Sequence, residues 1–184
     1  MQKQNANTAN YLELKIPIRT KTQWYNELCE AMQEERIPVR WQNGFYHITA
    51  VFVNDDLRVA ELREAFSRVL TGIKAPSITL DTLNAFLTSS RREIIVNLAP
   101  SHSSAEQLAL INNLRATATE VGANINPDFK MHITIGRVDA REATLDDVRR
   151  IISTIDVSPM TVPVKDINYL YLSNHAPIAR WTLE

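Results

Sequence analysis

Apolar and polar residues alternate along several short segments of this chain, and longer amphipathic segments separate them. Residues 12–18, LELKIPI, place an apolar side chain at every second position, which is typical of a half-buried strand. Residues 20–36 and 56–70 repeat their apolar residues at helical spacing, and Gly72 follows the second segment where helices commonly end. The first part of the chain is therefore predicted to alternate strands with helices.

The remainder of the chain continues this alternation. Residues 77–83 and 93–99 are strand-like, and the polar residues between them predict a hairpin loop. One helix is predicted to begin at Ser103 or Ser104 and another at Thr144, because the residues that follow complete a capping box. Two final strands are predicted at 164–172 and 178–183.

The order of elements predicts the fold class. A strand, a helix, a strand, a helix and two strands are followed by a helix, a strand, a helix and two strands, with short connections. This pattern favours an α+β fold with mainly antiparallel sheets and helices outside them. No linker-like segment divides the chain, so residues 1–184 are expected to form one domain with two lobes. Residues 1–10 are expected to form a flexible tail.

The tripeptide His-Ile-Thr occurs in two of the predicted strands, at 45–53 and 130–138, although the whole chain has only four histidines. Side chains of a strand point to alternate faces, so each copy places an imidazole and a hydroxyl on one face. The residues between them are apolar and anchor the strand. The four polar residues of the two copies are His47, Thr49, His132 and Thr134.

Two histidines and two hydroxyls suit acid–base chemistry at a phosphodiester. Because the reference pKa of histidine is about 6.5, one neutral imidazole can accept a proton while a second, protonated imidazole donates one. Threonine hydroxyls can donate hydrogen bonds to the non-bridging oxygens of a phosphate. The sequence has no closely spaced pair of metal ligands and no clustered glycines that would cradle a nucleotide phosphate. Neither a metal nor another cofactor is therefore expected.

The segments HITAVF and HITIGR, which lie about 85 residues apart, resemble the two signatures of the two-histidine (2H) phosphoesterases. Within that superfamily they resemble the 2′-5′ RNA ligase / RNA 2′,3′-cyclic phosphodiesterase family. The resemblance implies a bilobal, pseudo-twofold duplicated fold whose sheets line a central cleft, with the two motif strands side by side in it. It also implies hydrolysis of a 2′,3′-cyclic phosphate, in which one histidine activates water and the other protonates the leaving ribose oxygen.

The resemblance assigns roles residue by residue. His47 and His132 match the catalytic positions, and Thr49 and Thr134 match the phosphate-binding hydroxyls. The histidine of the second motif is more often the base in this family, but the sequence does not settle which histidine has which role. The name of the family also leaves open whether the chain ligates RNA.

Three further residues are candidates for binding the substrate. Arg137 matches a basic position that often follows the second motif, but strict alternation places it on the face opposite His132. A bulge at Gly136 would return Arg137 towards the phosphate. Trp41 could stack on a base or pack at the rim of the core. Tyr171 is a candidate because aromatic residues near this position border the substrate in relatives.

Charge and composition limit the partners. The net charge of −1 argues against a broad basic face for long nucleic acid, so an RNA end or a small cyclic nucleotide is the expected ligand. No apolar segment has the length of a membrane span or a signal peptide, so a cytoplasmic location without a membrane partner is expected. The oligomeric state is left open, and a monomer is compatible with the sequence. The alternative function is a module that binds RNA or a nucleotide in the same cleft without turnover.

Overall fold

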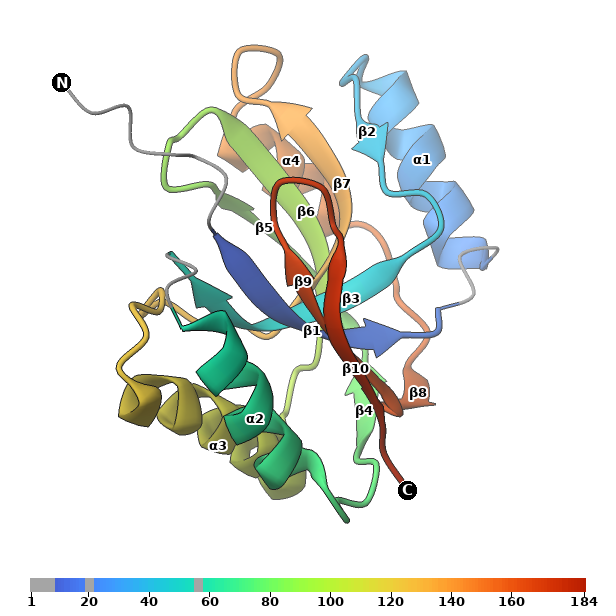
Figure 1. Ribbon diagram of the computed structural model, residues 1–184. Helices are drawn as coiled ribbons and strands as arrows, with labels where there is room; N and C mark the ends of the chain where they lie inside the picture. The colour runs from blue at the N-terminus through green and yellow to red at the C-terminus, as the bar shows by residue number, and fades with distance from the viewer. Residues whose placement is uncertain (1–8, 19–21, 55–57) are drawn as a thin grey trace, which may run out of the picture.

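The computed structural model describes residues 9–18, 22–54 and 58–184, which form four helices and ten strands (Figure 1). The predicted tail, residues 1–10, falls largely outside these ranges. Asn10, however, already belongs to the first strand and is buried. The elements are β1 (Asn10–Ile16), α1 (Gln23–Glu34), β2 (Arg40–Trp41), β3 (Tyr46–Val53), α2 (Val59–Leu70), β4 (Ser77–Leu80), β5 (Thr82–Leu87), β6 (Glu93–Ala99), α3 (Ala105–Val121), β7 (Ile133–Asp139), α4 (Leu145–Ile152), β8 (Met160–Pro163), β9 (Asp166–Tyr171) and β10 (Pro177–Thr182).

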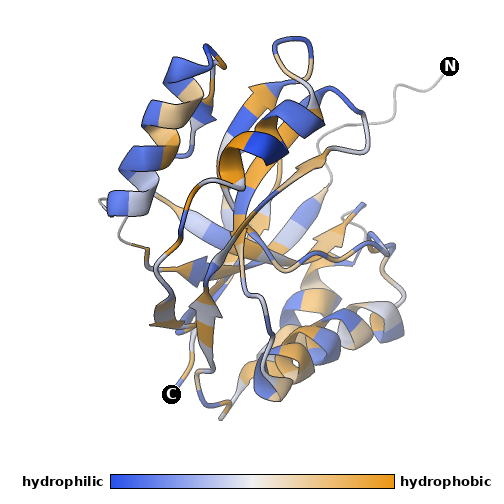
Figure 2. Cartoon of the chain, turned by 180° about the vertical axis from the view of Figure 1, so that it is seen from behind, coloured by the Kyte–Doolittle hydropathy of each residue, from blue (hydrophilic) through white to orange (hydrophobic). Residues whose placement is uncertain are grey.

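Two antiparallel four-stranded sheets form the frame of the molecule. Their strand orders are β10-β9-β1-β3, called here the first sheet, and β2-β7-β6-β5, called the second sheet, while β4 pairs with β8. Helices α2 and α3 pack together beside the first sheet, and α1 and α4 lie beside the second (Figure 1). Hydrophilic and hydrophobic residues alternate around the helices, as expected where only one face is buried (Figure 2). The predicted α+β fold with mainly antiparallel sheets is confirmed.

The two sheets exchange strands between the two repeats of the chain. In the first repeat β1 pairs with β3, and in the second repeat β6 pairs with β7. The last strand of the first repeat, β5, joins β6 in the second sheet, whereas β9 of the second repeat joins β1 in the first sheet. Each of the two four-stranded sheets therefore contains strands from both repeats.

This arrangement corrects the grouping that the sequence suggested. The strand at 93–99 was grouped with the first repeat, but its pairing with β7 shows that it opens the second. The strand predicted at 77–83 is two strands, β4 and β5, which separate at Asp81. The carboxylate of Asp81 accepts hydrogen bonds from the backbone N–H and the hydroxyl of Ser101, at 2.7 and 2.6 Å. The chain can therefore turn from one sheet to another at this residue.

The capping boxes predicted in the second repeat are confirmed. Ser104 accepts a hydrogen bond from the backbone N–H of Gln107 at 3.2 Å, and the Gln107 side chain reaches back to the N-cap. Thr144 and Asp147 form the same reciprocal pair at the start of α4. Such contacts satisfy backbone N–H groups that a helix leaves without an intrahelical partner. They fix where each helix begins.

A β-bulge follows the first motif. Ala50 is an extra residue in β3, between the residues that pair with Leu12 and Glu13 of β1. A bulge of this kind reverses the alternation of the side chains that follow it. Val51 and Val53 are consequently buried, whereas strict alternation would have placed them on the face of the motif side chains.

A second bulge lies at the equivalent position after the other motif. Ile135 is the extra residue of β7, because Asn97 pairs with Thr134 and the preceding residue, Val96, pairs with the residue after Ile135. The alternation is again reversed, so Arg137 points to the same face as Thr134 rather than to the opposite one. Arg137 therefore points towards the pocket, as a bulge was expected to allow. The extra residue is Ile135, one position before Gly136.

The buried faces of both sheets contribute to a single cluster of packed apolar residues. Leu12 of β1 and Ile48 of β3 come from the first sheet, and Leu98 of β6 and Ile133 of β7 come from the second. All four side chains are inaccessible to solvent. The central residue of each His-Ile-Thr tripeptide thus anchors its strand in the core, as the alternation predicts.

Candidate active site

The two motif strands meet at a pocket of about 150 Å³. The histidines and threonines of both motifs line it, together with Arg137. The segment between β2 and β3 adds Gln42 and Phe45, which sequence reasoning did not identify. The structure therefore brings together five of the seven site residues predicted from the sequence, from two sheets and both repeats.

The imidazole of His47 faces a buried carboxylate on the neighbouring strand. Its Nδ1 lies 3.5 Å from Oε2 of Glu13, and the amide nitrogen of Asn168 donates to the other oxygen of that carboxylate at 3.0 Å. An ionised carboxylate only accepts hydrogen bonds, so this contact favours a proton on Nδ1. In the neutral ring, Nε2 is then the nitrogen that can accept a proton.

The imidazole of His132 has a neutral acceptor instead. Its Nδ1 lies 2.7 Å from the carbonyl oxygen of Lys130, which can only accept, so Nδ1 donates. The ring of Phe86 packs against it edge to face, with 5.1 Å between the ring centroids. His132 is thereby held in one orientation and one tautomer, again with Nε2 unprotonated in the neutral ring.

Burial lowers the pKa of both imidazoles from the ordinary value of 6.5, because desolvation disfavours the charged form. At His47 the carboxylate of Glu13 opposes this effect, and at His132 the backbone carbonyl of Lys130 opposes it. The nearby positive charge of Arg137 lowers both pKa values further. Near neutral pH the empty pocket therefore favours neutral imidazoles, and a bound phosphate anion would favour their protonation.

Replacing Glu13 with glutamine is expected to lower the pKa of His47, because the change removes the negative charge that stabilises its protonated form. The pKa of His132 should not fall, because the buried carboxylate faces His47. Titration of the imidazole Cε1–H signals by NMR measures both values in one sample. Glu35→Gln is a suitable control, since Glu35 is exposed and pairs with Arg150. An unchanged pKa of His47 in the Glu13 variant would contradict the expected role.

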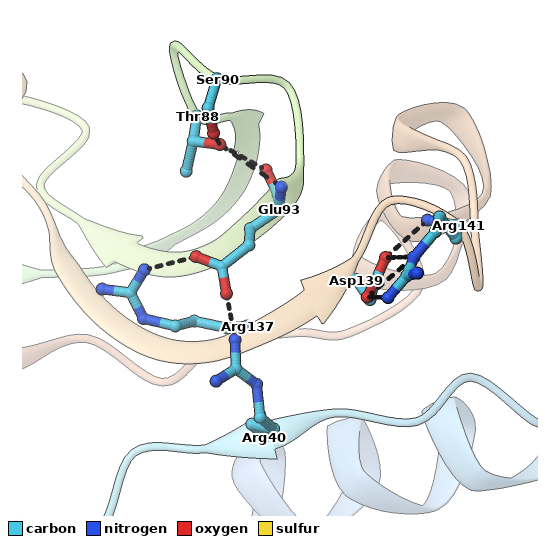
Figure 3. A network of polar contacts seen from close by, with 7 residues as sticks. All are labelled: Arg40, Thr88, Ser90, Glu93, Arg137, Asp139 and Arg141. Atoms are coloured by element: carbon cyan, nitrogen blue, oxygen red, sulfur yellow. Dashed lines mark hydrogen bonds and ion pairs between the residues drawn. The ribbon is translucent and has the colours of Figure 1, made fainter.

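The guanidinium of Arg137 is oriented by a carboxylate outside the pocket. Its Nη1 lies 3.2 Å from Oε2 of Glu93 on the adjacent strand β6. Glu93 also pairs with Arg40, which lies opposite Arg137 on β2 (Figure 3). The pocket thus has a positively charged rim on the side of the second sheet.

Trp41 does not line the pocket with the motif residues, and its stacking on a base stays a prediction. Its indole packs against the ring of Tyr25 on α1, with 5.5 Å between centroids. On its other side it closely approaches Gly136, where an added Cβ would lie 3.1 Å from the indole and 2.7 Å from Cγ1 of Val39. Trp41 therefore packs at the rim of the core, the alternative that the sequence left open.

Tyr171 is also outside the residues that line the pocket, because it lies on the wrong face of its strand. It shares a face of β9 with Tyr169, which is fully buried and packs against Phe66. Residues of the opposite face, such as Asn168 and Leu170, face the cleft. Tyr171 therefore lines neither the pocket nor the cleft, and its contact with the substrate stays a prediction.

A larger hollow of about 790 Å³ continues from the pocket across the first sheet. It shares His47 and Phe45 with the pocket. His175 lines this hollow, and its Nδ1 lies 3.0 Å from the hydroxyl of Tyr11. Burial, followed by the nearby charge of Glu13, raises the pKa of Tyr11 to about 12, so its hydroxyl stays protonated.

The described part of the chain has neither a group of metal-binding side chains nor a membrane-spanning helix. Across residues 9–18, 22–54 and 58–184, no three His, Cys, Asp or Glu side chains are grouped so that they could hold a metal ion. Over the same ranges, no helix is both long enough and apolar enough to cross a membrane.

Several solved structures share this fold. A crystal structure of a phosphoesterase has a TM-score of 0.59 at 19% identity, covering 96% of this chain and 98% of its own. LigT from E. coli in complex with 3′-AMP has a TM-score of 0.58 at 19% identity, with the same coverage. Usb1 from Kluyveromyces marxianus has a TM-score of 0.64 at 10% identity, covering 96% of this chain and 99% of its own. At these identities the likeness is one of fold.

The sequence itself carries the family assignment. No curated protein matches the chain in sequence. The model of the 2′-5′ RNA ligase superfamily, in contrast, matches residues 39–176, a range that includes both motifs and most of the chain. This match confirms the resemblance found in the two His-Ile-Thr segments. The chain therefore belongs to the 2′-5′ RNA ligase superfamily.

Proposed function

We propose that the protein is a phosphoesterase that hydrolyses 2′,3′-cyclic phosphates, on RNA ends or on small cyclic nucleotides, by general acid–base catalysis without a metal. The observation that carries this proposal is the convergence of two imidazoles, two threonine hydroxyls and one guanidinium on a single pocket. Membership of the superfamily supports it. Structures with this fold include LigT complexed with 3′-AMP and Usb1 with uridine monophosphate, which supports a nucleotide as the ligand.

In the proposed reaction a water molecule attacks the phosphorus of the cyclic phosphate. One neutral imidazole accepts a proton from this water at Nε2 as the new P–O bond forms. The bond between phosphorus and one ribose oxygen breaks, and the second imidazole, protonated at the start, donates its proton to that oxygen. The product is a phosphomonoester, and the two histidines have exchanged protonation states.

The remaining side chains of the pocket would bind the phosphate. The hydroxyls of Thr49 and Thr134 can donate to the two non-bridging oxygens, and Arg137 offers a guanidinium fork to the same oxygens. These donors stabilise the additional negative charge that develops on the phosphoryl oxygens during attack. Because the donors are fixed on rigid strands, they need little reorganisation during the reaction.

The surroundings of the two imidazoles support different roles for them. The carboxylate of Glu13 stabilises a protonated His47, whereas the backbone carbonyl near His132 carries no full charge. His47 is therefore the better candidate for the general acid and His132 for the general base. This assignment agrees with the more frequent arrangement that the family resemblance implies.

The proposal is tested by incubating the native protein with a short RNA that ends in a 2′,3′-cyclic phosphate, and with a cyclic mononucleotide, in the presence of EDTA. We expect conversion to a phosphomonoester, and the position of the product phosphate shows which ribose oxygen leaves. Activity that EDTA abolishes would contradict a metal-free mechanism. Saturable binding of both ligands without any product would instead favour a binding module that uses the same cleft.

A further inference from the structure

Two arginines lie directly opposite each other at the rim of the proposed active site. Arg40 of β2 and Arg137 of β7 are register partners, and they are called here the guanidinium pair. Like charges that face each other across two strands are normally unfavourable. The carboxylate of Glu93, one strand further along the sheet, compensates this repulsion because both arginines donate to it (Figure 3).

The backbone of Glu93 is held in place by the hairpin between β5 and β6. The backbone N–H of Thr88 donates to the carbonyl of Glu93 at 2.9 Å, and the Thr88 hydroxyl accepts from the Glu93 N–H at 3.3 Å. Ser90 contacts the same hydroxyl at 3.1 Å (Figure 3). Glu93 therefore pairs with both arginines from a backbone position that the hairpin holds in place.

The guanidinium pair keeps a positive charge exposed to solvent. One carboxylate compensates two guanidinium groups, and 72% of the Arg40 side chain and 42% of the Arg137 side chain are accessible. Arg137 lines the pocket with the two histidines, whereas Arg40 is not among its lining residues. Arg40 thus places a cation one strand away from the reacting group.

Further arginines continue this surface away from the pocket. Arg91, Arg92 and Arg141 line the next hollow together with Glu93 and Asp139. Arg141 donates to both oxygens of Asp139 (Figure 3). With the guanidinium pair, this side of the second sheet carries five arginines against three carboxylates, Glu93, Asp139 and Glu142, in a chain whose net charge is −1.

The hollow over the first sheet differs in charge. Its cationic side chains, Lys15 and Arg180, are matched by the carboxylates of Glu13 and Asp166. A polyanion would therefore meet a balanced surface there and an excess of positive charge along the second sheet.

We propose that Arg40, held beside Arg137 by their shared carboxylate, is a second anion site, which binds the phosphodiester next to the reacting cyclic phosphate, so that the preferred substrate is an oligoribonucleotide rather than a mononucleotide. This inference rests on the proposed function and specifies its substrate class. Arg137 contacts the reacting phosphate, and Arg40 contacts the neighbouring one. The chain of the RNA then leaves the pocket along the second sheet, towards Arg92 and Arg141.

The test compares a 2′,3′-cyclic mononucleotide with a tetranucleotide that ends in the same 2′,3′-cyclic nucleotide, at several NaCl concentrations. The native protein should have the higher kcat/KM with the tetranucleotide. Arg40→Ala should lower that value roughly tenfold, as expected for the loss of one charge-assisted contact. It should also make the salt dependence of kcat/KM for the tetranucleotide shallower, by about 0.7–1 in the log–log slope. Turnover of the mononucleotide should not change, which also shows that the variant is folded.

Arg180→Ala is the matched control, because it removes one arginine from the hollow over the first sheet. This control should not distinguish the two substrates. Equal effects of Arg40→Ala on both substrates, or no effect on either, would overturn the inference, as would a tetranucleotide-specific loss in Arg180→Ala alone. If the native protein turns over neither substrate, the proposed function itself fails. Turnover of both substrates without preference leaves that function standing and overturns only the second anion site.

Discussion

Alanine at His47 or His132 is expected to lower the turnover of a 2′,3′-cyclic phosphate by about 10²–10⁴-fold in each case, since each would remove one of the two proton-transfer groups. The two losses should not add fully in the double variant. Both groups act in the same displacement, and groups that act as a unit are strongly non-additive. Rates measured at saturating substrate separate this effect on turnover from any change in binding.

His102→Ala serves as the control for these variants. His102 is exposed, lies in a loop and contacts Ser101, so its removal should leave turnover unchanged. Near-native turnover in either motif variant would contradict the two-histidine mechanism. If only one variant lost activity, a mechanism with a single acid–base residue would be the better description.

Arg137→Ala should lower kcat by about 10²–10³-fold, the effect typical of removing one donor that stabilises developing negative charge. Arg137→Lys should recover only part of this loss, because lysine restores the charge but not the planar fork that matches two phosphoryl oxygens. Steady-state kinetics with the cyclic mononucleotide measures the change. Loss of Arg137 leaves Glu93 paired with Arg40, so the variant is expected to fold normally.

The division of the effect between kcat and KM is the informative part of this measurement. Stabilisation of the transition state predicts a loss in kcat, whereas a purely attractive role for the charge predicts a higher KM at unchanged kcat. Arg63→Ala, on the exposed face of α2, controls for the loss of one positive charge. An unchanged kcat in Arg137→Ala would contradict a role for Arg137 at the reacting phosphate.

Much of this site follows from the sequence, because its main signals are local. Alternation in a strand and periodicity in a helix depend only on nearby residues, and they predicted the types of most elements correctly. The repeated His-Ile-Thr tripeptide indicated which strands meet, and the structure places both in one pocket.

The bulges could not be predicted in the same way. An extra residue at Ala50 or Ile135 becomes visible only when the partner strand shows which pairs are skipped. Strict alternation therefore placed Val51 on the wrong face and left the orientation of Arg137 open. Gly136 offered a signal near the second bulge, but its main role is the close approach of Val39 and Trp41.

The buried partner of His47 was also invisible in the sequence. Glu13 occupies a polar position on an alternating strand, and a residue in such a position ordinarily faces solvent. Its environment is set by Asn168, which is distant in the sequence and reaches it only because β9 pairs with β1. Electrostatic partners that depend on such long-range pairing carry no local sequence signal.

The exchange of β5 and β9 between the two sheets has a consequence for the unfolding of the protein and for the behaviour of its fragments. A cut between the repeats would separate β5 from β6 and β9 from β1, and it would leave an exposed strand edge in each fragment. Open edges of this kind readily pair with other chains. Each sheet contains strands from both repeats, so neither repeat can unfold without breaking both sheets. We therefore expect the two sheets to unfold together in one cooperative transition. We also expect the separated fragments to regain structure only when they recombine.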